Sequence, residues 1–351
     1  MSEWQKLQKF SQIFGASISL FLNSLVVLLV AKKSPKALGT YKNLLILIAM
    51  FEIIYSVLEV LVKPVLFQTF TSFGSTFVMI VNVRDSLLSY DVLLLLVSLC
   101  CAFFGSLMVM FSVQFIYRFW AVSGNNSIKT FEGVRIFWWL LPSILVGTMW
   151  GIAAYFPCSP RPSTDAFLRE FILKEFGLEV TENVYIAPYF YEKNEDGTTD
   201  IYYPSFVTIF ATTVTVIISV SVIFYFGFKC YTSLQKFKEI ESSKHIQNLQ
   251  NQLFYSLVAQ TLIPLFLVHT PAFALYTFSF LRINIGSLTG ITTITTAIFP
   301  ALDPLPTLII VRSYRNAIRE SISSIFNSFT TIFKKSHGNS ILPVQARTGT
   351  V

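Results

Sequence analysis

Long runs of apolar residues alternate with shorter polar stretches along the whole chain. Seven runs each hold at least 22 residues, and a helix of that length spans roughly 33 Å, enough for the hydrocarbon core of a bilayer. Because lipid offers no partner for backbone N–H and C=O groups, each run must be helical. The pattern predicts an all-α membrane protein, a seven-transmembrane helix bundle. Its spans are residues 10–31, 43–66, 92–117, 133–156, 204–228, 253–280 and 288–311.

Charge sets the expected orientation of these spans. The chain is 53% apolar and 13% charged, with a formal charge of +7. The connections after odd-numbered spans, with the tail, hold 17 basic and 4 acidic residues, against 8 and 12 on the other side. Basic residues stay in the cytosol during insertion, so residues 1–9 are expected outside and the tail inside. The positive charge therefore indicates a cytoplasmic surface facing lipid and partners, with no nucleic-acid binding.

The longest polar connection, residues 157–203, carries its own pattern. Between residues 164 and 176 the apolar side chains follow one helical face, and residues 194–197 read as a turn between two Tyr-rich edges. Long loops without packing or function are uncommon, so we expect a folded outer lid over the bundle. The first outer loop, 67–91, is expected to include a short strand or turn.

The cytoplasmic connections are basic and favour helix. Residues 229–252 are expected to extend the fifth and sixth helices into the cytosol. Residues 312–335 repeat apolar side chains at spacings of three and four, flanked by Arg and Lys. That spacing is typical of an amphipathic membrane-surface helix on the inner leaflet. Residues 336–351 are polar and are expected to be a disordered cytoplasmic tail.

Three acidic residues and one lysine lie deep within the apolar spans, where they are costly. Glu52 has no local partner, so we expect either a protonated carboxyl or a bond to a neighbouring helix within a switch. Glu59 and Lys63 stand four residues apart, which favours an intrahelical pair near the outer interface or a polar rim on a ligand cavity. The remaining one, Asp303, lies within a proline-rich stretch of the seventh span.

Prolines interrupt the last two spans. Pro264 and Pro271 lie in the sixth, and Pro300 and Pro304 flank Asp303 in the seventh. Proline removes a helical hydrogen bond, so both spans are expected to bend there. Bent helices that change tilt suit a two-state signal transmitter, although static packing would leave the same pattern.

The sequence gives no sign of an enzyme. We find no nucleophile–base arrangement, phosphate loop, paired catalytic carboxylates or metal-ligand spacing, so neither a cofactor nor a metal is expected. Four cysteines are too few for a disulfide scaffold. Buried unpaired thiols are favoured, and whether Cys158 is disulfide-bonded to Cys100 or Cys101 stays open.

Several stretches resemble the nematode Str-type seven-transmembrane G-protein-coupled chemoreceptors. They are LQNQLFYSLVAQTLIP at residues 249–264, VQFIYR at 113–118, FPALDPLP at 299–306 followed by Tyr314-Arg315, and the pattern of the second outer loop. The resemblance covers nearly the whole chain. It implies an odorant receptor of the plasma membrane in sensory cilia that couples to a heterotrimeric G protein. No Asp-Arg-Tyr triplet occurs, so activation details of rhodopsin-like receptors do not transfer wholesale.

On this interpretation, a small volatile or lipophilic ligand binds in the outer half of the bundle. The pocket would be mostly apolar with a few polar groups, although each residue serves helix packing equally well. The candidates are Tyr90, Leu94, Ser98, Cys101, Phe206, Phe210, His269, Phe273, Thr292 and Thr295. Ligand binding would favour one tilt of the bent helices and open an inner crevice for a Gα C-terminus. The candidates for this crevice are Arg118, Lys236, Lys238 and Gln250. The switch and hinge candidates are Glu52, Pro264, Pro271, Pro300, Asp303 and Pro304.

Two other functions remain open at this level. A seven-helix ligand-gated channel or transporter would fit the span count, but insect-type olfactory channels have the reverse orientation. A peptide or pheromone receptor would use the acidic outer loop. The sequence leaves the ligand, the Gα subtype, the cell type and the oligomeric state undetermined.

Overall fold

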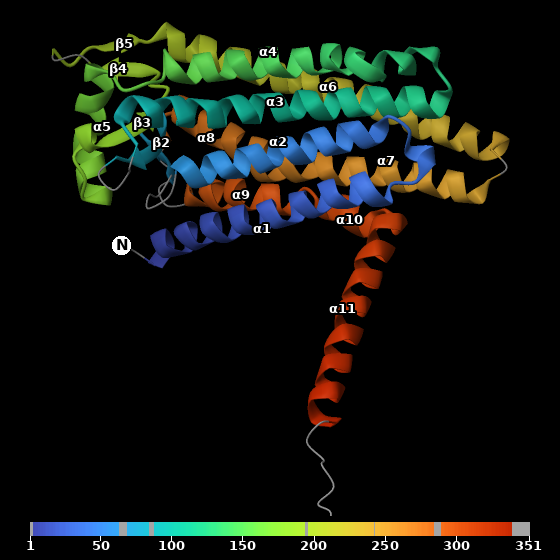
Figure 1. The fold of residues 1–351 in the computed structure, drawn as a ribbon. Helices are drawn as coiled ribbons and strands as arrows, with labels where there is room; N and C mark the ends of the chain where they lie inside the picture. The colour runs from blue at the N-terminus through green and yellow to red at the C-terminus, as the bar shows by residue number, and fades with distance from the viewer. Residues whose placement is uncertain are drawn as a thin grey trace, which may run out of the picture.

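The computed structural model describes residues 3–62, 69–83, 88–193, 196–241, 243–283 and 289–338. Seven helical segments in it are long and apolar enough to cross a membrane, and they run side by side as a bundle (Figure 1). They are α1 (Glu3–Lys33), α2 (Tyr41–Val62), α3 (Tyr90–Ser123), α4 (Ile136–Tyr155), α6 (Tyr203–Ile240), α7 with η5 and α8 (Lys244–Pro264, Leu265–His269, Thr270–Phe280), and α9 with α10 (Thr289–Leu302, Leu305–Ile310). The predicted seven-helix fold is confirmed.

Several helix ends lie beyond the apolar runs from which the spans were predicted. The helix α6 continues to Ile240 and α7 begins at Lys244, as the helix-compatible basic connection suggested. Apolar length marks what must be buried in lipid, whereas polar residues with good helix propensity carry the helices further. Short 3-10 segments lie in the connections. They are η1 (Lys36–Leu38) between α1 and α2, η2 (Asn126–Phe131) and η3 (Gly133–Arg135) between α3 and α4, and η4 (Val180–Glu182) between α5 and β3.

The helix α3 is the centre of the bundle, in contact with α2, α4, α6 and α7. It approaches α4 closely because small residues face each other. Ser106 Oγ donates to Ser143 O and Ser143 Oγ donates to Ser106 O, both at 3.0 Å. A Cβ added to Gly105 would lie 2.5 Å from Cγ of Trp150. Close approach through small side chains is the usual packing mode of membrane helices.

The two loops at one end of the bundle fold together, and we call this the lid end. Strands β1 (Thr69–Phe73), β2 (Thr76–Asn82) and β3 (Asn183–Ile186) form an antiparallel sheet, which joins the connection after α2 to the connection after α4. The expected helix in the second loop is α5 (Pro162–Phe176), and the expected hairpin is β4 (Tyr191–Lys193) with β5 (Thr199–Ile201). Residues 194–195 of its turn lie outside the described residues.

A separate apolar cluster holds this lid together. Val78 and Ile80 of β2 pack with Leu168 and Ile172 of α5 and with Tyr185 of β3. Tyr185 Oη donates a hydrogen bond to Asp165 at the start of α5. The second loop is therefore a packed unit over the helix ends, which limits access to the bundle from that side.

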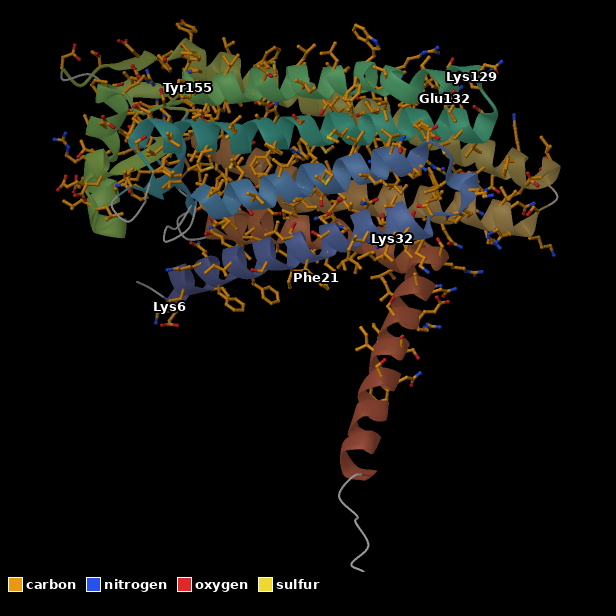
Figure 2. The ribbon with its side chains drawn as sticks, viewed as in Figure 1. Lys6, Phe21, Lys32, Lys129, Glu132 and Tyr155 are labelled. Atoms are coloured by element: carbon orange, nitrogen blue, oxygen red, sulfur yellow. The ribbon has the colours of Figure 1, made fainter. Side chains whose placement is uncertain are left out.

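The last helix, α11 (Arg312–Gly338), leaves the bundle at a steep angle at the opposite end (Figure 1). It exposes Ile322, Ile325 and Phe326. Residues 336–338, expected in a disordered tail, form its last turn, and 339–351 lie outside the described residues. Figure 2 shows Lys32 and Lys129 at the α11 end and Lys6 and Tyr155 at the lid end.

Candidate functional site

A wide helical turn interrupts the sixth span midway. The N–H of Thr270 bonds to the carbonyl of Leu265, five residues back, and η5 is therefore a π-turn. Thr270 Oγ1 donates to the same carbonyl at 2.8 Å. Pro271 explains the position, since its ring clashes with the carbonyl four residues earlier in a regular helix and a wider turn moves that carbonyl away. The turn leaves Val268 and His269 buried.

Beside η5 lies a cavity of about 430 Å³, within the usual range for small-molecule sites. Side chains of α3, α4, α6, η5, α8 and α9 form its walls, and lid residues Phe77, Met79, Ile186 and Pro188 form its roof. The wall is mainly apolar and aromatic, with threonine hydroxyls between. None of the described residues that line it is charged. An ionic ligand would therefore lose its hydration here without gaining a counter-charge.

His269 is the most distinctive polar group of the cavity. Its imidazole is buried, and its Nε2 has no hydrogen-bond partner among the described residues. A buried polar atom without a partner costs free energy that a suitable ligand atom would recover. The cavity thus presents one unsatisfied polar atom in an otherwise apolar wall.

Two thiols also line the cavity, those of Cys101 and Cys158, and no disulfide joins them. Burial, with the Cys101 thiol nearby, raises the pKa of Cys158 to about 12. This thiol is therefore protonated at neutral pH and a weak nucleophile. It contributes a small apolar surface to the site, in line with the expectation of buried unpaired thiols.

The structure brings four of the ten predicted pocket residues to the cavity. They are Cys101, His269, Phe273 and Thr292. The other six lie elsewhere among the described residues. On α3, Tyr90 lies below the lid, Leu94 is buried, and Ser98 Oγ donates to the carbonyl of Leu94 at 2.8 Å. Because α3 is surrounded by other elements, its apolar pattern does not reveal which face meets the cavity.

The remaining three predicted residues sit outside the cavity wall for different reasons. Phe206 packs edge-on against Phe190 and Phe280 at the lid end. Phe210 is 72% exposed on the outer surface of α6. Thr295 donates to the carbonyl of Thr292 at 3.2 Å, back into its own helix.

Some residues that line the cavity were not predicted from the sequence. Tyr276 follows His269 by seven residues and Phe273 by three, so helical spacing could have placed it on the same face. Trp150 of α4 gave no comparable signal, and its Nε1 donates to Thr215 Oγ1 at 3.0 Å. The roof residues Phe77 and Met79 could not be found from the sequence, because only the tertiary fold brings β2 over the helices.

A polar network crosses the middle of the bundle. Asn23 Nδ2 donates to the carbonyl of Pro300 at 3.2 Å. In a regular helix that carbonyl would accept from residue 304, but Pro304 has no N–H. The break between α9 and α10 at Asp303-Pro304, expected from the prolines, is thereby supported by a side chain from α1.

Two buried carboxyl groups meet in the same network. Glu52 and Asp303 are close enough to interact, and both are buried. Gln260 Nε2 donates to Asp303 Oδ2 at 3.3 Å, and Thr307 Oγ1 donates to Gln260 Oε1 at 3.1 Å. Glu52 thus faces a neighbouring helix, one of the two arrangements expected from the sequence. The network connects α2, α7 and the α9–α10 break.

Tyr55 Oη donates to Glu59 Oε1 at 2.9 Å. The expected partner of Glu59, Lys63, lies outside the described residues. Among the described residues, His, Cys, Asp and Glu side chains form no group of three suited to a metal ion.

At the α11 end, Arg118 and Gln250, both predicted to line the inner crevice, are in direct contact. Arg118 Nη2 donates to Gln250 Oε1 at 2.8 Å, and the guanidinium lies 5.0 Å from the ring centroid of Tyr41. Lys236 and Lys238 are exposed near the end of α6. The buried Arg118 thus contacts the neutral side chains of Gln250 and Tyr41.

Comparisons with known proteins agree with this architecture. A family model described as "Serpentine type 7TM GPCR chemoreceptor Str" matches residues 8–319. The chain is 33% identical to G-protein coupled receptor str-217 of Caenorhabditis elegans, over 97% of each chain. It is 27% identical to Serpentine receptor class r-10 of the same nematode, over 90% of this chain and 91% of that one. The crystal structure of squid rhodopsin superposes with a TM-score of 0.53 at 12% identity, covering 97% and 92% of the two chains, which supports the fold alone.

Proposed function

Because the chain belongs to the Str family of serpentine seven-transmembrane chemoreceptors, we propose that it binds a small uncharged ligand in the cavity below the lid and activates a heterotrimeric G protein. The observation that carries this proposal is the buried, unpartnered Nε2 of His269 in a cavity of about 430 Å³. The absence of charge among the described lining residues favours a neutral, largely apolar molecule. A volatile odorant with one oxygen or nitrogen atom has these properties.

The position of His269 suggests how binding is transmitted. It lies in η5, the wide turn that joins α7 to α8. A ligand atom that bonds to Nε2 prefers one geometry of this turn and shifts the population toward it. The other end of α7 carries Gln250, the partner of Arg118. A change of α7 tilt would therefore separate this pair and expose a crevice beside Arg118, Lys236 and Lys238.

The proposal includes an orientation. The lid end faces outside and the α11 end faces the cytosol, as the distribution of basic residues suggests. The apolar side chains of α11, with Arg315 and Arg319 beside them, would then lie on the inner leaflet. The receptor would reside in the plasma membrane of sensory cilia.

Reconstitution tests the proposal directly. The full chain in phosphatidylcholine vesicles, with purified Gαβγ, is exposed to a panel of small neutral volatiles while nucleotide exchange on Gα is measured. We expect at least one compound to accelerate exchange, and His269→Ala to raise the concentration that it needs. His245→Ala, an exposed histidine in the first turn of α7, is the matched control. An unchanged dose–response curve for His269→Ala would remove the cavity as the site, and exchange without any dependence on the panel would contradict a volatile ligand.

A further inference from the structure

The wall of the cavity includes side chains that also belong to the outer surface of the bundle. Ile217 of α6 is 58% exposed and Phe273 of α8 is 59% exposed, yet both line the cavity. Thr270 shares this property. A residue that borders both the cavity and the exterior marks a place where the cavity opens sideways.

Helical spacing shows that this exposure is to the exterior rather than to the cavity itself. Phe210 and Phe224 stand seven residues before and after Ile217, which places all three on one face of α6. Both are highly exposed, at 72% and 68%, and neither lines the cavity. Phe280 stands seven residues after Phe273 on α8, and Phe266 lies in η5. Both are exposed, and neither lines the cavity. The opening therefore lies on a face that the bilayer covers.

Contacts between helices close the opening both towards the lid end and towards the α11 end. At the lid end, α6 and α8 meet through Phe206 and Phe280, with ring centroids 5.9 Å apart, and Tyr191 of β4 packs against both. Towards the α11 end, α6 packs against α7 instead. Between these two contacts lie Ile217 and Phe273, each about 10–16 Å along its helix from the aromatic contact at 1.5 Å rise per residue.

The lid covers the route by which a ligand would enter the cavity from water. Phe77, Met79 and Ile186 of the roof are all buried, so they separate the cavity from the lid surface. Phe77 packs against Tyr276 of α8 with ring centroids 4.7 Å apart. Thr76 Oγ1 donates to the carbonyl of Pro188 at 3.1 Å, which ties the first loop to the second. Entry from this side would require the lid to move as a unit.

We infer that the cavity is loaded from the bilayer, through a window between α6 and α8 whose edges are Ile217 and Phe273. The inference deepens the proposed function and rests on its ligand site. It narrows the ligand class to uncharged molecules that partition into lipid, because a charged species is rare at that depth and finds no counter-charge among the described lining residues. The occupancy of the receptor would therefore follow the concentration of the ligand in the membrane.

The two cavity thiols allow the route to be measured without a known ligand. The full chain in phosphatidylcholine vesicles is held at pH 9, which raises the thiolate fraction of each buried thiol about a hundredfold over pH 7. It is treated with N-phenylmaleimide, which is neutral and lipophilic, or with a quaternary-ammonium methanethiosulfonate, which stays in water. Modification of Cys101 and Cys158 is followed by peptide mass spectrometry. The window variants are Ile217→Trp and Phe273→Trp. Phe210→Trp, on the same face of α6, and Phe266→Trp, at an exposed residue of η5, are the matched controls, since neither residue lines the cavity.

We expect the window variants to slow maleimide labelling of Cys101 by about tenfold, equivalent to ~1.4 kcal/mol of added barrier, while the controls label like the wild type. Ile217→Ala and Phe273→Ala should widen the window and speed labelling, which separates a blocked route from a distorted fold. The charged reagent should label both thiols slowly in every variant. Rapid labelling by the charged reagent, or equal maleimide rates in window and control variants, would overturn the inference. The assay contains no G protein, so a failure of signalling and a failure of this route are told apart.

Discussion

Arg118 of α3 donates two hydrogen bonds to one residue of α7, to the backbone carbonyl of Gln250 at 3.0 Å and to its Oε1 at 2.8 Å. Arg118 is only 2% exposed. Its guanidinium also lies over Tyr41, whose hydroxyl donates to Gln114 Oε1 at 3.0 Å. The contact fastens α3 to α7 at the end where the proposed G-protein crevice would open.

Gln250→Ala should raise basal nucleotide exchange on Gα in the absence of ligand. The variant removes one hydrogen bond to a charged group, which contributes about 1.5–3 kcal/mol, and keeps the bond to the backbone carbonyl. The closed arrangement is thereby weakened but not abolished. Asn251→Ala, the next residue on α7, is the control and should leave basal exchange unchanged. Equal basal rates in both variants would show that the contact does not restrain the receptor.

Glu52→Gln should leave the thermal midpoint of the detergent-solubilised receptor unchanged or raise it by about 2–4 °C, the shift produced by 1 kcal/mol. An apolar interior disfavours two adjacent negative charges, so a neutral amide of the same shape should fit beside Asp303 without loss. Asn23→Leu should lower the midpoint, since it leaves the carbonyl of Pro300 without its donor. A large loss for Glu52→Gln would mean that the carboxylate is ionised and paired with a cation.

Gly147→Ala should destabilise the bundle by about 1–3 kcal/mol, the cost of overpacking a close contact. A Cβ at this position would overlap Ser106 Oγ of α3. Gly151→Ala on the same helix is the milder comparison. Its Cβ would lie 3.3 Å from that of Ala102, a tight contact that should cost less than the overlap at Gly147. Adding Ser106→Ala to Gly147→Ala should restore part of the loss in a thermal unfolding assay. No recovery in the double variant would place the strain elsewhere.

Tyr185→Phe should loosen the lid locally by about 1–3 kcal/mol, because Asp165 loses a donor. Hydrogen exchange of the β2 and β3 amides measures this, with the exposed Tyr203→Phe as control. Burial, reinforced by Asp165, also raises the pKa of Tyr185 above its ordinary value. An unfolded phenol ionises near pH ~10, whereas the folded one stays protonated. Lid stability should therefore fall as the pH rises above that value in the wild type, and the Phe variant should lack this contribution.

Asn125, within the sequence Asn125-Asn126-Ser127, should carry no glycan in cells, since the proposed orientation places it in the cytosol. Asp196→Ser creates a second acceptor sequence at Asn194 in the second outer loop, which should be modified. Glycosidase treatment followed by gel mobility separates the two cases. Sugar on Asn125, or none at Asn194 in the variant, would reverse the orientation and remove the proposed signalling surface.

Hydrophobic length was enough to determine the number and order of the spans, because each stretch must satisfy its own backbone in lipid. The prolines likewise located both helix breaks, at η5 and at Asp303-Pro304. In the long connection 157–203, apolar spacing located α5. These features depend on local chemistry, which the sequence contains in full.

The cavity depends on contacts between elements that are far apart in the sequence, and no local pattern contains them. Rotation of α3 among four neighbouring helices decided that Cys101 lines it while Leu94 and Ser98 do not. The pairing of β2 with β3 decided which loop residues form the roof. Lipid-facing and cavity-facing apolar residues have the same composition, so Phe210 and Phe273 looked alike in the sequence. Only the packing of whole helices against one another separated them.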